Sequence, residues 1–161
     1  ARFSIADSTF SQTLPMANYL VTRYISDSEH EVWREYELRL AFGPLIRMLL
    51  NRFGELAGHA LTERLCERLS IWVRESGWNV IVTGNGIVNR QYFDTLESAL
   101  GFYVDLIRHF QSEASPALGP RMMDGIVRDV LIKLDPYRRE LLIRHIYSLT
   151  SVSGIPNLVS R

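Results

Sequence analysis

The chain has 161 residues, of which 47% are apolar and 11% aromatic, with 18 basic and 18 acidic side chains. These values exclude a disordered or collagen-like chain, and they predict a single globular core that needs no metal or disulfide. A formal net charge of zero argues against nucleic-acid binding and leaves little repulsion between copies. We therefore expect a homo-oligomer or a complex with a partner protein domain.

The number of cysteines and the length of the apolar runs indicate in which cellular compartment the protein is expected. Cys66 is the only cysteine, so the chain has no internal disulfide and a reducing compartment is the simplest setting. No run approaches the roughly 18 apolar residues of a membrane span. The sequence therefore predicts a cytoplasmic protein with no membrane anchor.

Composition suggests three segments. Residues 1–13 carry Ser, Thr and Asp without periodicity, which predicts an N-terminal arm. Residues 14–150 are expected to form a single helical domain with a hairpin, starting with a helix from about Pro15 to Asp27. Residues 151–161 have the punctuation of a linker, so we expect them to lead to a further domain.

A second helix is predicted to begin at Ser28, because Ser28 and Glu31 have the spacing of a capping box. This helix places Trp33, Tyr36 and Leu40 on one face. The recurrence of large apolar residues at spacings of three and four predicts that this face packs on the core.

Gly43–Pro44 is predicted to break or kink that helix, or to open the next one. From Leu45 an apolar stripe continues at helical spacing through Gly54 and Gly58, and the helix is expected to end at Gly77. The spacing of the two inner glycines indicates close packing of two helices within a soluble core rather than a membrane contact.

A β-hairpin insert is predicted around residues 78–92, where β-branched residues replace the helical rhythm. Asn85–Gly86 lies between the two β-branched runs and is the preferred pair for a type I′ turn. Such a turn needs positive φ at both central residues, which Asn and Gly tolerate. The flanking glycine at position 84 has neither the lysine nor the following helix of a phosphate-binding loop.

The rest of the chain again reads as helix. A helix capped by Asp94 is expected to run to about Phe110, and the prolines and glycine of residues 112–120 predict a loop. A further helix covers residues 122–134, and Asp135–Pro136 begins the last one, which ends near residue 150. The fold class is therefore mainly α: a bundle-like domain of five to seven helices with one β-hairpin insert.

No pattern in the sequence indicates catalysis. No two of the four histidines are four residues apart, so no helical metal site is expected, and no cofactor motif occurs. His109 and His145 are predicted to have helix-end or surface roles, where a cation is favoured by the helix dipole. Cys66 is interpreted as a small core residue. We therefore expect no enzyme and no bound cofactor or metal.

One local resemblance concerns residues 69–78. The pattern of a helix ending in Trp72, an aliphatic residue, three variable residues, Gly77 and Trp78 resembles the second homology motif of Bcl-2-type apoptosis regulators. The resemblance implies a Bcl-2-like helical fold, although one glycine stands where that family usually has two. The alternative interpretation is a helix that ends at glycine with both tryptophans packed on the core.

These observations favour a non-catalytic regulatory, sensory or protein-interaction module of a larger cytoplasmic protein, acting through self-association or contact with a partner domain. The alternative is a sensor that binds a small apolar ligand in an aromatic-lined cavity between helices. We expect the contacts to involve the base, tip and exit of the hairpin. The residues singled out are Trp72, Trp78, Asn85, Gly86 and Tyr92.

Overall fold

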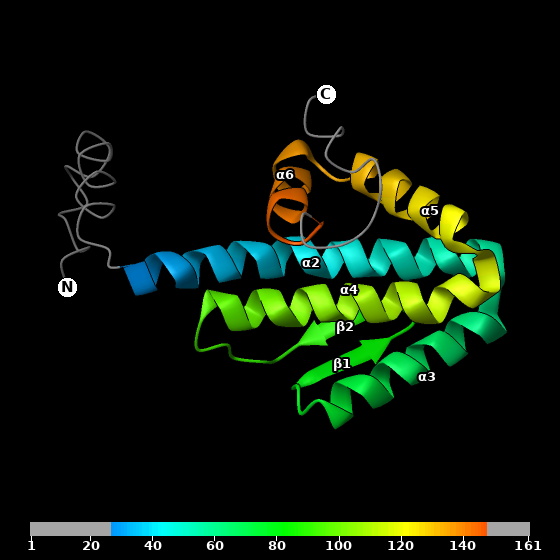
Figure 1. Cartoon of the computed structure of the whole chain (residues 1–161), viewed down its shortest axis with the longest axis horizontal. Helices are drawn as coiled ribbons and strands as arrows, with labels where there is room; N and C mark the ends of the chain where they lie inside the picture. Colours follow the sequence, from blue (N-terminus) through cyan, green and yellow to red (C-terminus); the bar gives the residue numbers. More distant parts are fainter. Residues whose placement is uncertain (1–26, 148–161) are drawn as a thin grey trace, which may run out of the picture.

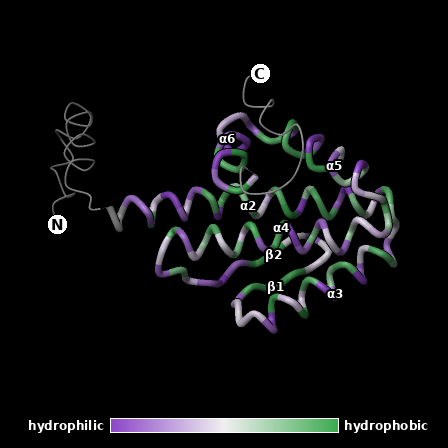
Figure 2. Tube along the Cα trace, in the orientation of Figure 1, coloured by the Kyte–Doolittle hydropathy of each residue, from purple (hydrophilic) through white to green (hydrophobic). Residues whose placement is uncertain are grey.

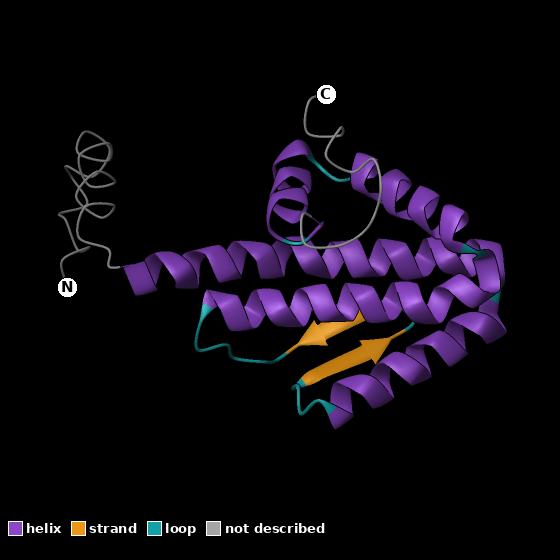
Figure 3. Ribbon diagram, viewed as in Figure 1, coloured by secondary structure: helices purple, strands orange, loops and turns teal. Residues whose placement is uncertain are grey.

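The computed structural model describes residues 27–147 (Figure 1). In chain order its elements are α2 (Asp27–Ala57), α3 (His59–Glu75), β1 (Val80–Thr83), β2 (Gly86–Asn89), α4 (Leu96–Leu118), α5 (Pro120–Lys133) and α6 (Pro136–His145). The predicted mainly α fold with one hairpin insert is confirmed (Figure 3). The expected arm, first helix and C-terminal tail lie outside the described residues.

The long helix α2 is the centre of the fold. It packs against β2, α4, α5, α6 and α3. In Figure 1, α4 runs alongside α2, the hairpin and α3 lie on one side of this pair, and α5 and α6 lie on the other. Apolar residues recur along each helix (Figure 2). The largest fully buried side chains are Tyr103, Phe42, Phe53, Phe102, Phe110, Leu38, Leu45, Ile46, Leu49, Leu50, Leu69 and Leu106.

The expected break at Gly43–Pro44 is wrong, because α2 continues through Pro44 to Ala57. Proline removes the backbone bond to the carbonyl of the residue four positions earlier, which is Leu40. The Leu40 side chain is about half exposed, so this carbonyl lies on the side of the helix where water can replace the lost donor. The capping box expected at Ser28 also falls inside α2, which begins at Asp27.

The continuous helix expected from Leu45 to Gly77 is also wrong. Gly58 has φ +90°, a conformation that favours glycine, and it separates α2 from α3. Gly54 lies against the start of α3, since a Cβ added there would be 3.2 Å from Oγ1 of Thr62. The two glycines thus form a tight helix–helix corner, and the expected close packing of two helices holds at Gly54.

The expected boundaries at both ends of α4 are also wrong. The loop expected over residues 112–120 is helical as far as Leu118, with Pro116 inside α4 and on its exposed side. The N-cap of α4 is Thr95 rather than Asp94, and its side chain accepts a hydrogen bond from the Ser98 amide at 3.1 Å. The cap at Asp135 is confirmed, because its carboxylate accepts from the Arg138 amide at 3.0 Å.

The hairpin is confirmed, but its turn is shifted by one residue. Thr83 pairs with Gly86, so the two-residue loop is Gly84–Asn85. Gly86 has the expected positive φ, +122°, whereas Asn85 does not, so the predicted type I′ turn at Asn85–Gly86 is wrong. Gly86 instead lies against α2, where a Cβ would be 3.2 Å from Cβ of Arg47.

Candidate interaction surface

An apolar stripe lies on the exposed side of α2, near the N-terminal end of the helix. Val32 is 68% exposed, Trp33 60%, Tyr36 49% and Leu40 48%. Their spacing of three and four residues places them on one side of the helix. The first turns of α2 also extend beyond the start of α4 (Figure 1). We call Val32, Trp33, Tyr36 and Leu40 the α2 stripe.

The aromatic part of the α2 stripe is a pair of rings in contact. Trp33 and Tyr36 meet edge to face, with ring centroids 6.2 Å apart. Such aromatic pairs carry large apolar area with few rotatable bonds, and they are enriched where proteins meet. The pair therefore presents a contiguous apolar surface.

A groove of about 680 Å³ adjoins the α2 stripe on the hairpin side. The residues that form it come from α2, the end of β2, the loop that follows, and the start of α4: Glu31, Val32, Glu35, Tyr36, Arg39, Asn89, Arg90, Tyr92, Phe93, Asp94, Thr95 and Leu96. Tyr92 is 92% exposed in this groove. The structure thus brings Tyr92, one of the predicted contact residues, next to the α2 stripe.

A polar network forms the floor of the groove and fastens the hairpin exit to α2. Arg39 donates to the backbone carbonyls of Asn89 at 3.1 Å and Gln91 at 2.5 Å, and its guanidinium pairs with Glu35 at 3.0 Å. Tyr103 on α4 donates its hydroxyl to the same carboxylate at 3.0 Å, and the Asn89 amide donates to that hydroxyl at 3.3 Å. Three elements therefore share one set of charge-assisted bonds.

The electrostatics of this network hold it in one protonation state. Burial of Tyr103, together with the nearby Glu35 carboxylate, raises the pKa of its hydroxyl well above the usual range. The hydroxyl therefore stays a donor to Glu35 at neutral pH. The Arg39 guanidinium also lies 6.0 Å from the ring centroid of Phe93. Both charged groups of the floor are thus engaged, so the floor is structural and positions the loop that carries Tyr92.

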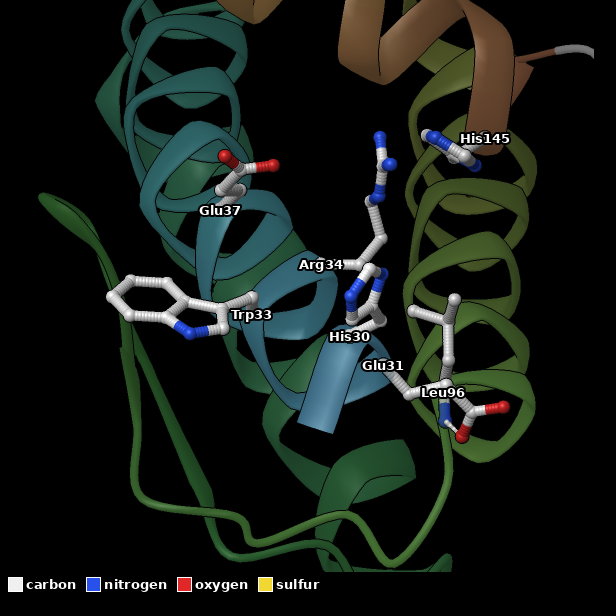
Figure 4. Close-up of a pocket in the computed structure, with 7 residues that line it drawn as sticks. All are labelled: His30, Glu31, Trp33, Arg34, Glu37, Leu96 and His145. Carbon is white, nitrogen blue, oxygen red and sulfur yellow. Dashed lines mark hydrogen bonds between the residues drawn. The ribbon is translucent and has the colours of Figure 1, made fainter. Parts of the chain in front are cut away.

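A second hollow, of about 500 Å³, lies on the other side of α2 (Figure 4). It is lined by His30, Glu31, Trp33, Arg34, Glu37, Leu96 and His145. In Figure 4 the Trp33 ring points away from the space into which Arg34 extends. The α2 stripe therefore runs between two hollows.

The second hollow is lined by basic and acidic side chains together with Trp33 and Leu96. Burial lowers the pKa of His145, and the neighbouring Arg34 and Arg144 add to that effect. Glu37 accepts a hydrogen bond from the Tyr137 hydroxyl at 2.7 Å. Residues 27–147 contain no group of three or more His, Cys, Asp or Glu side chains arranged to hold a metal. His145 closes α6, which agrees with its predicted helix-end position.

Trp72 and Trp78 occupy a different place, at the base of the hairpin. Trp72 stacks on Phe102 with centroids 6.3 Å apart, and Trp78 lies 5.0 Å from the same ring. Both tryptophans are half-buried and pack on the core, as the glycine-ended helix interpretation predicts. The helix-end position expected for His109 is wrong: it lies within α4, and its ring stacks on Trp72 at 4.2 Å.

The hairpin tip and the strand edges are partly covered by other elements. Asn85 is exposed, but Gly86 is buried against α2. Arg39 covers a carbonyl at the β2 end, and the Ser70 hydroxyl lies 3.4 Å from the carbonyl of Val82 on β1. The five predicted contact residues therefore fall in three separate places, and Tyr92 is the one that lies beside the α2 stripe.

The sequence interpretation treated the α2 stripe as a core face, and this is wrong for Trp33, Tyr36 and Leu40. A signal was present, because α2 also carries Leu38 and Phe42 on another side, and a helix with two apolar sides can bury one and expose the other. The buried side faces α4 and the hairpin. The second apolar side remains for another contact.

None of the described helices combines the length and the apolar composition that a membrane crossing requires. Comparison with protein-family models, curated proteins and solved structures finds no match to this chain. Function is therefore inferred from the geometry of the described residues.

Proposed function

We propose that this domain is a non-catalytic interaction module, and that it works by binding another protein chain on the α2 stripe and the adjoining groove around Tyr92. The single observation that supports the proposal is the continuous exposed apolar stripe on the helix α2. Exposed apolar surface of this kind is costly in water, and on a folded domain it commonly marks a contact site.

The surroundings of the stripe fit that role. Polar groups at its border, such as Arg39 and Glu37, already have partners within the fold, so a partner chain need not leave them unpaired. The polar network holds the loop that carries Tyr92 in place, which lowers the entropy cost of binding. The balanced charge and the single buried cysteine favour the cytoplasm as the setting.

Position-specific photo-crosslinking in the cells that express the gene tests this proposal. Leu40 is replaced by a photo-reactive phenylalanine analogue in the full chain, and Ile132, which is 52% exposed on α5, is replaced in a matched control. We expect a discrete crosslinked product from position 40 at several times the yield from position 132. Equal yields, or no product at position 40, would refute the proposal.

A further inference from the structure

We infer that residues 14–26 of the same chain cover the α2 stripe when no partner is bound, by folding back along α2 as a short amphipathic helix. These residues lie outside the described part of the chain. Such a contact occupies the surface that a partner needs. It therefore regulates the interaction proposed above, and to that extent the inference rests on the proposed function.

The point where this segment joins α2 lies close to the α2 stripe. α2 begins at Asp27, and the stripe begins five residues later, at Val32. Ser26 and Glu29 have the spacing of a capping box, which favours a new helix starting at Asp27 over one that continues from the preceding residues. The chain before Ser26 is therefore expected to leave the axis of α2.

The segment is long enough to cover the stripe. Antiparallel helices are commonly joined by loops of about two to five residues, and residues 25–26 supply the shortest such loop. A helix that runs back along α2 from this loop advances about 1.5 Å per residue, as α2 itself does. Met16 then comes about level with Tyr36, and Leu20 about level with Val32. The segment therefore reaches most of the stripe.

The side chains of the segment suit a contact with an apolar surface. Arg23 is the only charged residue among residues 14–26. Four large side chains recur at spacings of three and four, which places them on one side of the predicted helix: Met16, Tyr19, Leu20 and Tyr24. Docking this side on the α2 stripe removes both apolar surfaces from water, which stabilises the closed arrangement.

Connectivity favours this segment over other occupants of the stripe. A short linker holds a segment at an effective concentration on the order of millimolar, which a separate chain has to match. Residues 148–161 belong to the same chain, but Gly154 and Pro156 interrupt any helix there. If the closed arrangement is about nine tenths populated, the dissociation constant of a partner is about tenfold higher than for the open stripe.

Photo-crosslinking of the purified full chain tests this contact. Tyr36 is replaced by a photo-reactive phenylalanine analogue, and Ile132 is replaced in a matched control, because both are about half exposed. An equal mixture of unlabelled and nitrogen-15 chains is irradiated and digested with trypsin. We expect the principal product to join residues 35–39 to residues 3–23, with both peptides unlabelled or both labelled. Its yield should be about fivefold or more above that of any product between position 132 and residues 3–23.

Two charge substitutions separate docking on the stripe from random encounters. Leu20→Asp places a carboxylate on the side of the predicted helix that meets the stripe, so the yield of the crosslink from position 36 should fall about fivefold or more. Thr22→Asp adds the same charge on the opposite side of that helix, and the yield should stay within about twofold of wild type. Far-ultraviolet circular dichroism checks that both variants fold.

The regulation is tested in cells, where Leu20→Asp should raise the yield of the partner crosslink from position 40 about threefold or more. An unchanged partner yield would overturn the regulation.

The outcomes distinguish this inference from the proposed function. A crosslink from position 36 that joins an unlabelled to a labelled peptide, that reaches residues 145–161 instead, or that both Asp variants weaken equally would overturn the inference, as would no product with residues 3–23. A crosslink from position 40 to a separate protein would still support the proposed function. The product within one chain, without any partner crosslink in cells, would support the contact and refute the proposed function.

Discussion

Replacing Gly86 by valine is the sharpest test of how the hairpin joins the central helix. At φ +122° an L-amino acid is strained, at a cost of about 1–3 kcal/mol. The added Cβ would also lie 3.2 Å from Cβ of Arg47, and the shift needed to relieve that contact costs about 1 kcal/mol more. We expect Gly86→Val to lower the free energy of unfolding by about 3 kcal/mol.

The assay is urea unfolding followed by far-ultraviolet circular dichroism, with Gly84→Ala as the matched control. Gly84 lies in the same turn, has no positive φ, and has no atom within 4 Å of a built Cβ. Its substitution should change stability by less than about 1 kcal/mol. If Gly86→Val unfolds within about 0.5 kcal/mol of wild type, or if both variants lose equal stability, the assigned turn and its contact with α2 are wrong.

Tyr103→Phe removes the hydroxyl that joins Glu35 to Asn89. Urea unfolding should show that the free energy of unfolding falls by about 2 kcal/mol, as for other hydrogen bonds to charged groups. An unchanged unfolding midpoint would argue against the network. Because the pKa of His145 is lowered by folding, the unfolded chain binds this proton more readily, so stability is present above about pH 6.5 and declines as the pH falls below it. Thermal unfolding of His145→Gln should show a weaker decline, and identical pH profiles would contradict this reasoning. Burial raises the pKa of the Cys66 thiol, so a thiol reagent should label the folded protein slowly and the denatured protein at once; rapid labelling of the folded chain would place Cys66 at the surface.

Local chemistry made some parts of the fold predictable. The Asp135 cap needs only a carboxylate next to a proline that starts a helix, and the structure has both. Gly86 between two β-branched runs likewise signals a hairpin and a positive φ. The turn type was not predictable from these residues, because contact with α2 fixes where the turn begins.

Tertiary packing decided the boundaries that were wrong. A proline inside a helix costs about 3 kcal/mol, which favours a break when residue 44 is considered alone. Around it, Ala41, Phe42, Leu45 and Ile46 are all buried, and burial of each large apolar side chain contributes about 1.5–3 kcal/mol. The sum exceeds the local cost, so α2 remains one helix. The sequence around Pro44 shows that these residues are apolar, but it does not show which other elements cover them.

The candidate surface was hidden for a related reason. Periodicity shows that Trp33, Tyr36 and Leu40 share a side of the helix, but it does not show which apolar side of α2 the other elements cover. That choice is made by α4 and the hairpin, whose contacts with α2 join residues far apart in sequence. Tyr92 reaches the α2 stripe only because Arg39 fixes the loop after β2.

The position of α2 in the chain also affects the order in which its buried side can be covered during synthesis. This helix precedes every other described element, yet its buried side is covered mainly by segments that follow it, as late as Ile146 in the core. About 60 residues separate the end of α2 from the end of α4, which at 5–20 residues per second takes roughly 3–12 s. Until α4 is complete, the part of α2 that packs against α4 in the folded chain has no α4 to cover it. We therefore expect the nascent chain to be more prone to aggregation before α4 has emerged from the ribosome than after it.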